Sequence, residues 1–216
     1  MASLHGSVSP TRMQLQKLKK RYIVARRGHK LLKDKLDELL KNFLELVKRN
    51  RDLRAAVDSA LAEAFTGFAV ARAVMSSEAV EEALMYPKER ATVTASSRNL
   101  MSVQVPQLKW DLEGQSDRSK IYPYGFALTS YELDRAIRLL SDTMPLLIEL
   151  AEVEKSVELL AEAIESTRRR VNALEHVMIP QLEADIKYIR MKLDEMERGN
   201  LTRLMKVKEI VRAKNV

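Results

Sequence analysis

Apolar residues recur at alternating spacings of three and four, almost without a break, from Leu15 to Val74. This heptad ladder is typical of a helix that packs against a helical partner along its whole length. At 1.5 Å per residue, roughly nine heptads make a helix on the order of 100 Å long. Two positions in the ladder are polar, His29 and Asn50. We expect them to fix the register of the coiled coil, as polar residues at such positions do.

A second ladder supplies the partner. It begins at Leu133 and keeps the same rhythm until, around Met178, successive steps of four replace the alternation. Such a stutter locally unwinds a left-handed supercoil. Pro180 lies inside it, and because proline removes a helical hydrogen bond we expect the helix to bend there and continue. The two ladders predict a mainly α fold, a long antiparallel two-helix coiled coil or helical hairpin.

Capping residues predict the bounds of the first long helix. Residues 1–8 are expected to form a flexible N-terminal tail. The helix then covers residues 9–86, because Ser9 is a suitable N-cap and Pro87 disfavours helical dihedrals in the residue before it. Thr11 offers a second hydroxyl to the free amides of the first turn.

The second long helix is expected to cover residues 129–216. Thr129 and Glu132 have the spacing of a capping box, in which a hydroxyl and a carboxylate satisfy free amides reciprocally. The chain is therefore divided into a tail, a long helix, an insert over residues 87–128 and a second long helix.

The insert loses the helical period and gains β-branched residues, turn formers and most of the prolines. Two short strands, near residues 91–94 and 102–106, are the simplest interpretation, with a connecting turn at residues 96–99. A lone hairpin is only marginally stable, so we expect it to pack against the helices or against a partner. Aromatic residues in or after it either pin the insert to the helices or form a docking surface: Trp110, Tyr122, Tyr124 and Phe126.

Composition excludes most catalytic chemistry. The chain has no cysteine, no glycine-rich phosphate loop and no histidine pair at metal-ligand spacing, so we expect no enzyme activity, no cofactor and no metal. No secretory signal pattern and no apolar run of about 18 to 20 residues is present, which favours an intracellular protein without direct membrane insertion. An acidic cluster is expected to form a solvated helix face: Glu149, Glu152, Glu154 and Glu158.

Charge is sorted along the chain. The total is +7, with a net charge of +9 over residues 1–50, +5 over residues 168–216 and −6 over residues 141–167. An antiparallel hairpin brings both basic termini to one end. Three interpretations of this end remain open: solvated charges with some pairs to Glu183, Asp185 and Glu195, a nucleic-acid footprint, or a charged shaft in an acidic protein cavity.

Three stretches resemble the D subunits of the V/A-type rotary ATPases, the central rotor axles. Residues 9–39 resemble the opening of that family's first helix, and residues 167–198 resemble its closing helix. Between them, the segment from Tyr124 to Asp134 resembles the return of the chain into the long helix. These stretches cover both arms and the hinge of the predicted hairpin.

The resemblance implies a non-catalytic axle that transmits torque during ATP-driven ion transport or ATP synthesis. Its implied partners are the catalytic A and B subunits, the small F subunit of the stalk and the protein that caps the membrane ring, in the cytoplasm and peripheral to the membrane. The expected bearing surface inside the A/B hexamer is basic, and Pro180 would bend the shaft. The bearing residues are Arg12, Lys17, Lys20, Arg21, Arg26, Arg27, Arg203, Lys206 and Lys208.

Small residues between Ala55 and Ala71 have two interpretations, a thin part of the helix seam or a contact for the small F subunit. The alternative function for the whole chain is a basic coiled-coil adaptor that binds nucleic acid or another filament. Such an adaptor would show steeply salt-dependent binding to duplex. The choice between proton and sodium transport lies with other subunits and is not determined by this sequence.

Overall fold

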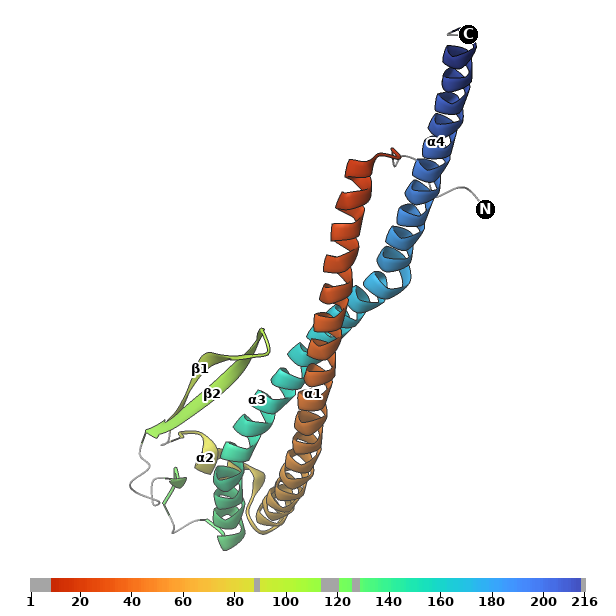
Figure 1. Cartoon of the computed structure of the whole chain (residues 1–216). Coiled ribbons are helices and arrows are strands. Elements are labelled where there is room, and N and C mark those ends of the chain that lie inside the picture. Colours follow the sequence, from red (N-terminus) through yellow and green to blue (C-terminus); the bar gives the residue numbers. More distant parts are fainter. Residues whose placement is uncertain (1–8, 88–89, 114–120, 126–128, 215–216) are drawn as a thin grey trace. The chain divides into compact units, whose positions relative to one another are not determined.

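The fold is a long helical hairpin with a small two-stranded antiparallel β-hairpin between its helices (Figure 1), which confirms the predicted fold class. The computed structural model describes residues 9–87, 90–113, 121–125 and 129–214. The predicted N-terminal tail and Phe126 lie outside these residues. Two compact units are distinguished, one made of residues up to Asp37 and from Glu165 onward, the other of Glu38–Ile164.

Helix α1 runs over Arg12–Val74, and the short helix α2 runs over Ser77–Leu84. The prediction of one helix over residues 9–86 is therefore wrong at both ends. The N-cap is Thr11, whose hydroxyl accepts the amide of Gln14 at 3.2 Å. At the other end, extended backbone at Ser76 interrupts the helix and starts α2, where the Ser76 hydroxyl accepts the amide of Ala79.

The second arm begins with α3 (Tyr131–Ala173), passes through the π-helical segment η2 (Leu174–Met178) and continues as α4 (Ile179–Lys214). The π segment lies at the stutter, and the helix does not end at Pro180. The ring of proline crowds the carbonyl four residues earlier, here His176, and that carbonyl lies in the wider π turn. Helix α3 also continues through Pro145.

The start of α3 differs from the predicted capping box. Ser130, not Thr129, is the N-cap, because its side-chain and backbone oxygens both accept the amide of Leu133. The Thr129 hydroxyl is buried and has no hydrogen-bond partner among the described residues. The predicted pairing of Thr129 with Glu132 is therefore wrong by one residue.

Strands β1 (Arg90–Leu100) and β2 (Val103–Glu113) pair antiparallel in an unbroken register. They are longer than predicted, and the turn lies at Met101 and Ser102 instead of residues 96–99. Both turn residues have positive φ, 54° and 70°, which matches the twist of the strands. Neither is glycine or asparagine, so the usual sequence signal for this turn is missing.

Each unit has its own apolar core. In the unit that holds the termini, Leu18 packs with Ile186 and Ile189. In the other unit, Ala71 packs with Val80 of α2 and Leu133 of α3. The buried α1 positions belong to the predicted ladder, although its last member, Val74, is exposed where the helix ends.

The corrected cap gives a direct test of local stability. Ser130→Ala should lower the free energy of unfolding by about 1 kcal/mol, since it removes the hydroxyl that caps α3. Thr129→Val is the matched control, and because it removes a buried hydroxyl without a described partner it should leave stability unchanged or raise it. Urea unfolding followed by circular dichroism measures both. A larger loss in the Thr129 variant would contradict the assignment of the cap.

Candidate interaction surfaces

The two long helices approach each other closely at a group of small side chains. A Cβ atom placed on Gly67 of α1 would lie 3.2 Å from the Cβ of Ala136 of α3. Ala64 and Ala71, on the same face of α1, are completely buried. These small residues therefore belong to the seam, which supports the first of the two interpretations for them.

Other small residues of the same stretch face outward. Ala55, Ala62 and Ala69 are exposed, and helical periodicity places them on one face of α1 with Ser59 and Thr66. Both hydroxyls donate to carbonyls of their own helix, Ser59 to Ala56 and Thr66 to Ala62. This outer face is consequently smooth and has few free polar groups, so another backbone can approach it closely.

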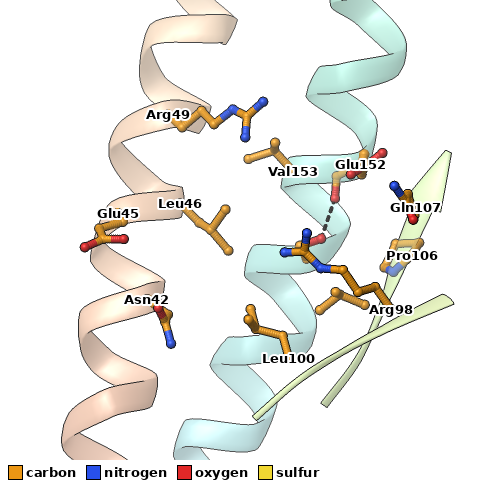
Figure 2. Close-up of a pocket in the computed structure, with 12 residues that line it drawn as sticks. Asn42, Glu45, Leu46, Arg49, Arg98, Leu100, Pro106, Gln107, Glu152 and Val153 are labelled. Atoms are coloured by element: carbon orange, nitrogen blue, oxygen red, sulfur yellow. Dashed lines mark hydrogen bonds between the residues drawn. The ribbon is translucent and has the colours of Figure 1, made fainter. Parts of the chain in front are cut away.

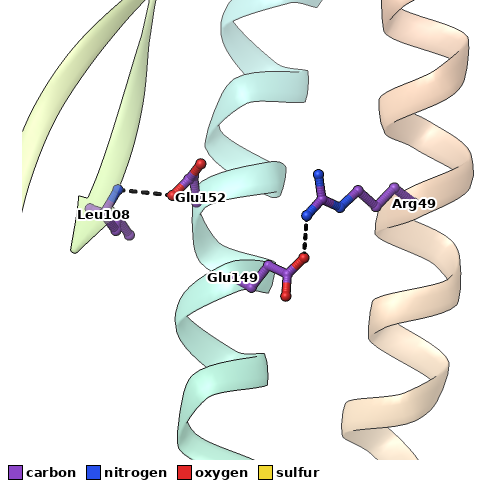
Figure 3. Close-up of polar contacts among 4 residues, drawn as sticks. All are labelled: Arg49, Leu108, Glu149 and Glu152. Carbon is purple, nitrogen blue, oxygen red and sulfur yellow. Dashed lines mark hydrogen bonds and ion pairs between the residues drawn. The ribbon is translucent and has the colours of Figure 1, made fainter. Parts of the chain in front are cut away.

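The β-hairpin is held to α3 by a carboxylate. The backbone amide of Leu108 in β2 donates to Glu152 Oε2 at 2.9 Å (Figure 3). Pro106, which pairs with Ser97, lies two positions before Leu108 in β2, so its nitrogen faces the same outer edge of the strand. Because proline has no N–H, it is tolerated at such an edge without the loss of a hydrogen bond to β1. The edge of β2 therefore faces the helix. Strand β1 is exposed along its length up to Asn99.

Glu149, one turn earlier, points the other way and pairs with Arg49 of α1 (Figure 3). Arg54 pairs with Glu154 at 3.1 Å, and Glu158 pairs with Lys155 on its own helix. The prediction of a solvated helix face therefore holds for Glu158, which is exposed, and is wrong for the other three. Glu149 and Glu154 connect α3 to α1, and Glu152 connects it to the hairpin, a role that no local signal in the sequence marks.

A cavity of about 340 Å³ lies where α1, α3 and the hairpin meet (Figure 2). Arg49 and Leu46 extend into it from α1, and Glu152 of α3 and Arg98 of β1 line it from the other side. Since its walls come from both helices and from the hairpin, the cavity marks the joint between the insert and the helices.

Two tyrosines that follow the hairpin pack against α3. Tyr122 is buried and accepts a hydrogen bond from Arg138 Nη2 at 3.0 Å, while the Tyr124 hydroxyl donates to Asp134 at 2.7 Å. Their ring centroids are 6.1 Å apart. Trp110 is half-buried. For Tyr122 and Tyr124, the interpretation as residues that pin the insert to the helices is supported.

The nine residues predicted for a bearing surface all lie exposed in the unit that holds the termini. Arg12 pairs with Glu197, and Lys206 pairs with Glu209 at 3.0 Å. The other seven are exposed cations: Lys17, Lys20, Arg21, Arg26, Arg27, Arg203 and Lys208. Of the carboxylates expected to form seam pairs, Glu183 accepts a hydrogen bond from Tyr22 of α1 at 2.7 Å, Glu195 pairs with Lys192 on its own helix, and Asp185 is buried.

Helix α4 continues beyond its last described contact with α1. Arg12 is the first residue of α1 and it pairs with Glu197, whereas α4 extends to Lys214. Every described residue from 198 to 213 is exposed. This terminal arm carries basic side chains and six exposed apolar ones, namely Leu201, Leu204, Met205, Val207, Ile210 and Val211. An exposed face of this kind is typical of a surface that a partner covers.

The residues predicted to set register or bend the helix lie at distinct places. His29 is half-buried, with Nε2 3.3 Å from Glu175 Oε2. Asn50 is half-buried on α1, and Pro180 is exposed just after η2. In the part of the chain that the structure describes, no helix is apolar and long enough to span a bilayer, and no group of three or more potential metal ligands occurs.

Comparison with known proteins gives one consistent result. The sequence profile of the ATP synthase D subunit matches residues 14–209. The D subunit of a V-type ATP synthase from Acetivibrio thermocellus is 62% identical over 204 residues, covering 94% of this chain and 91% of that protein. The protein of the same description from Clostridium novyi is 56% identical over 205 residues, 95% of each chain. That from Thermoanaerobacter sp. is 54% identical over 211 residues, 98% of this chain and 99% of its own.

The carboxylate that holds the hairpin is testable by hydrogen exchange. Glu152→Ala should speed exchange of the Leu108 amide by roughly tenfold or more, because a hydrogen bond to a charged group contributes about 1.5–3 kcal/mol. Glu152→Gln keeps an acceptor oxygen and should have a smaller effect. Glu149→Ala, one turn away, should leave this amide unchanged. Equal exchange in all three variants would show that Glu152 does not hold β2.

The Tyr124 phenol gives a pH-dependent test. Burial raises its pKa, and the hydrogen bond to Asp134 raises it further. Since the folded chain then holds this proton more tightly than the unfolded chain, the stabilisation is present below the unfolded pKa of about 10 and is lost as pH rises above it. Urea midpoints measured upward from pH 10 should fall more steeply for the unchanged chain than for Tyr124→Phe. Parallel curves would contradict this coupling.

Proposed function

This chain belongs to the family of ATP synthase D subunits, and on that basis we propose that it is the central stalk of a V/A-type rotary ATPase. It transmits torque between a hexamer of catalytic A and B subunits and the rotor ring in the membrane. ATP is hydrolysed on the other subunits, and this chain has a mechanical role at the periphery of the membrane. The observation that carries the proposal is the terminal arm of α4, an exposed basic and apolar helix that extends past its partner.

The hexamer contact lies in the unit that holds the termini. All nine predicted bearing cations are exposed there, and the apolar side chains of the terminal arm need a partner to leave water. An acidic, partly apolar inner wall of the hexamer satisfies both requirements. The proposed bearing residues are those of the sequence prediction, including Arg21 and Arg203.

The other unit contacts the small F subunit and the protein that caps the membrane ring. For the F subunit, the support is the smooth outer face of α1 at Ala55, Ala62 and Ala69. For the ring cap, it is the exposed apolar pair Met85 and Tyr86 after α2, with Tyr86 lining a cavity of about 280 Å³. Both are surfaces on which a partner removes apolar area from water.

Reconstitution with purified A and B subunits tests the proposal. A chain that ends at Glu197 keeps the paired helices and should fold with an unchanged melting temperature. Its affinity for the hexamer should fall at least about tenfold, since losing even 1.4 kcal/mol of contacts has that effect. ATPase coupling in the complex should be lost with it.

The full-length chain is the control, and both are assayed by co-elution and by ATP hydrolysis. Unchanged hexamer binding by the shortened chain would contradict the assignment of the terminal arm. Recovery of nucleic acid in place of A, B and F subunits from the native cell would instead favour the basic adaptor.

A further inference from the structure

An apolar groove opens beside the π segment, within the unit that holds the termini. Its volume is about 650 Å³, and its walls come from α1 on one side and from η2 and α4 on the other. We call it the η2 groove. Its lining residues are Lys20, Arg21, Val24, Ala25, Gly28, Leu174, Met178 and Leu182.

The groove follows from the stutter in the second ladder. In η2 the amide of Ile179 bonds to the carbonyl of Leu174, five residues back, so each later side chain is rotated relative to α1. Met178 stands at a ladder position, yet 51% of its surface is exposed. On the facing helix Val24 is 69% exposed. The groove thus lies where the helix changes from α to π geometry and Met178 is left exposed.

Gly28 deepens the groove on the side of α1. No atom outside its own helix backbone lies within 4 Å of a Cβ built on this residue. Glycine is the least favourable residue for a helix interior apart from proline. Because Gly28 carries no side chain, the space beside it is left for a side chain of a partner.

The charges beside the groove have one sign. Lys20 and Arg21 line it, and no carboxylate is among its lining residues. Asp185 lies in the adjoining cavity next to Arg21, but it is buried and already has an interaction. Lys20 and Arg21 give the edge of the groove a positive charge, and the guanidinium of Arg21 suits a carboxylate in particular.

We propose that the η2 groove seats an acidic segment of the catalytic hexamer, with a bulky apolar side chain in the groove and a neighbouring carboxylate on Lys20 and Arg21. This inference rests on the proposed function and names the chemistry of the partner at one point of the bearing. The occupant is a protein segment because the groove continues the basic surface already assigned to the hexamer.

The groove also gives the shaft a distinguishable face. Lys30 follows Gly28 by two residues and so lies on the opposite side of α1. A hexamer with three equivalent interfaces meets one groove, so one interface at a time engages it. Rotation by a third of a turn transfers the groove to the next interface.

Filling the groove tests the proposal. Gly28→Leu occupies the space, and it should raise the melting temperature because leucine favours helix over glycine. Its affinity for purified A/B hexamer should fall roughly tenfold or more, as should that of Arg21→Glu. Lys30→Leu and Lys30→Glu, on the opposite face of α1, are the matched controls for added bulk and for reversed charge, and both should bind as the unchanged chain does.

Photo-crosslinking identifies the occupant. Benzoylphenylalanine at Val24 should react with a peptide of the A or B subunits that contains a carboxylate beside a large apolar residue, whereas the same probe at Ile23 should not. Crosslinks to a second copy of this chain or to the F subunit, or equal crosslinks from both positions, would overturn the proposal. If the unchanged chain binds the hexamer and Gly28→Leu binds equally, the groove is refuted and the stalk function stands. If the unchanged chain does not bind, the proposed function fails as well.

Discussion

The burial of one apolar stripe on each long helix is the interaction on which the rest of this structure depends. A helix that is buried along one stripe leaves most of its circumference in water, and the stabilisation per residue is smaller than in a layered domain. Each compact unit therefore relies on a few fully buried residues, such as Leu39, Leu133 and Ile189. The other faces are free for partners, and the charge and side-chain size of these faces distinguish the two units.

The two surfaces proposed to bind partners lie where the packing of the long helices deviates from a regular coiled coil. Near Gly67 the helices come close enough for glycine and alanine to touch, and the opposite face of α1 is lined with small residues. At η2 the helix has π geometry, and Met178, which a regular coiled coil would bury, remains exposed. Both deviations have a simple cause, the size of the side chain in one case and the number of residues per turn in the other.

Carboxylates supply the specific contacts that a smooth seam lacks. Glu149 and Glu152 are three residues apart on α3, yet one reaches α1 and the other reaches the edge of β2. The first is an exposed ion pair, which stabilises little by itself. The second satisfies a backbone amide on a strand edge that would otherwise be open, and it fixes where the hairpin meets the helix. The insert is held by this bond and by the tyrosine contacts with α3.

The sequence by itself determined the helical hairpin, the seam positions, the site of the irregular turn before Pro180 and the family. These features depend on periodicity, on a stutter and on long ordered similarity, all of which are visible along one chain. Tertiary structure decided the rest. The cap of α3 is Ser130 and not Thr129, and the first long helix ends before Ser76. The turn of the hairpin lies at Met101 and Ser102. The sequence did not determine these three features, because each depends on competition between neighbouring hydroxyls or between backbone conformers. The role of Glu152 and the η2 groove depend on the elements packed against them, β2 and α1. A sequence does not show which element will pack against a given helix face.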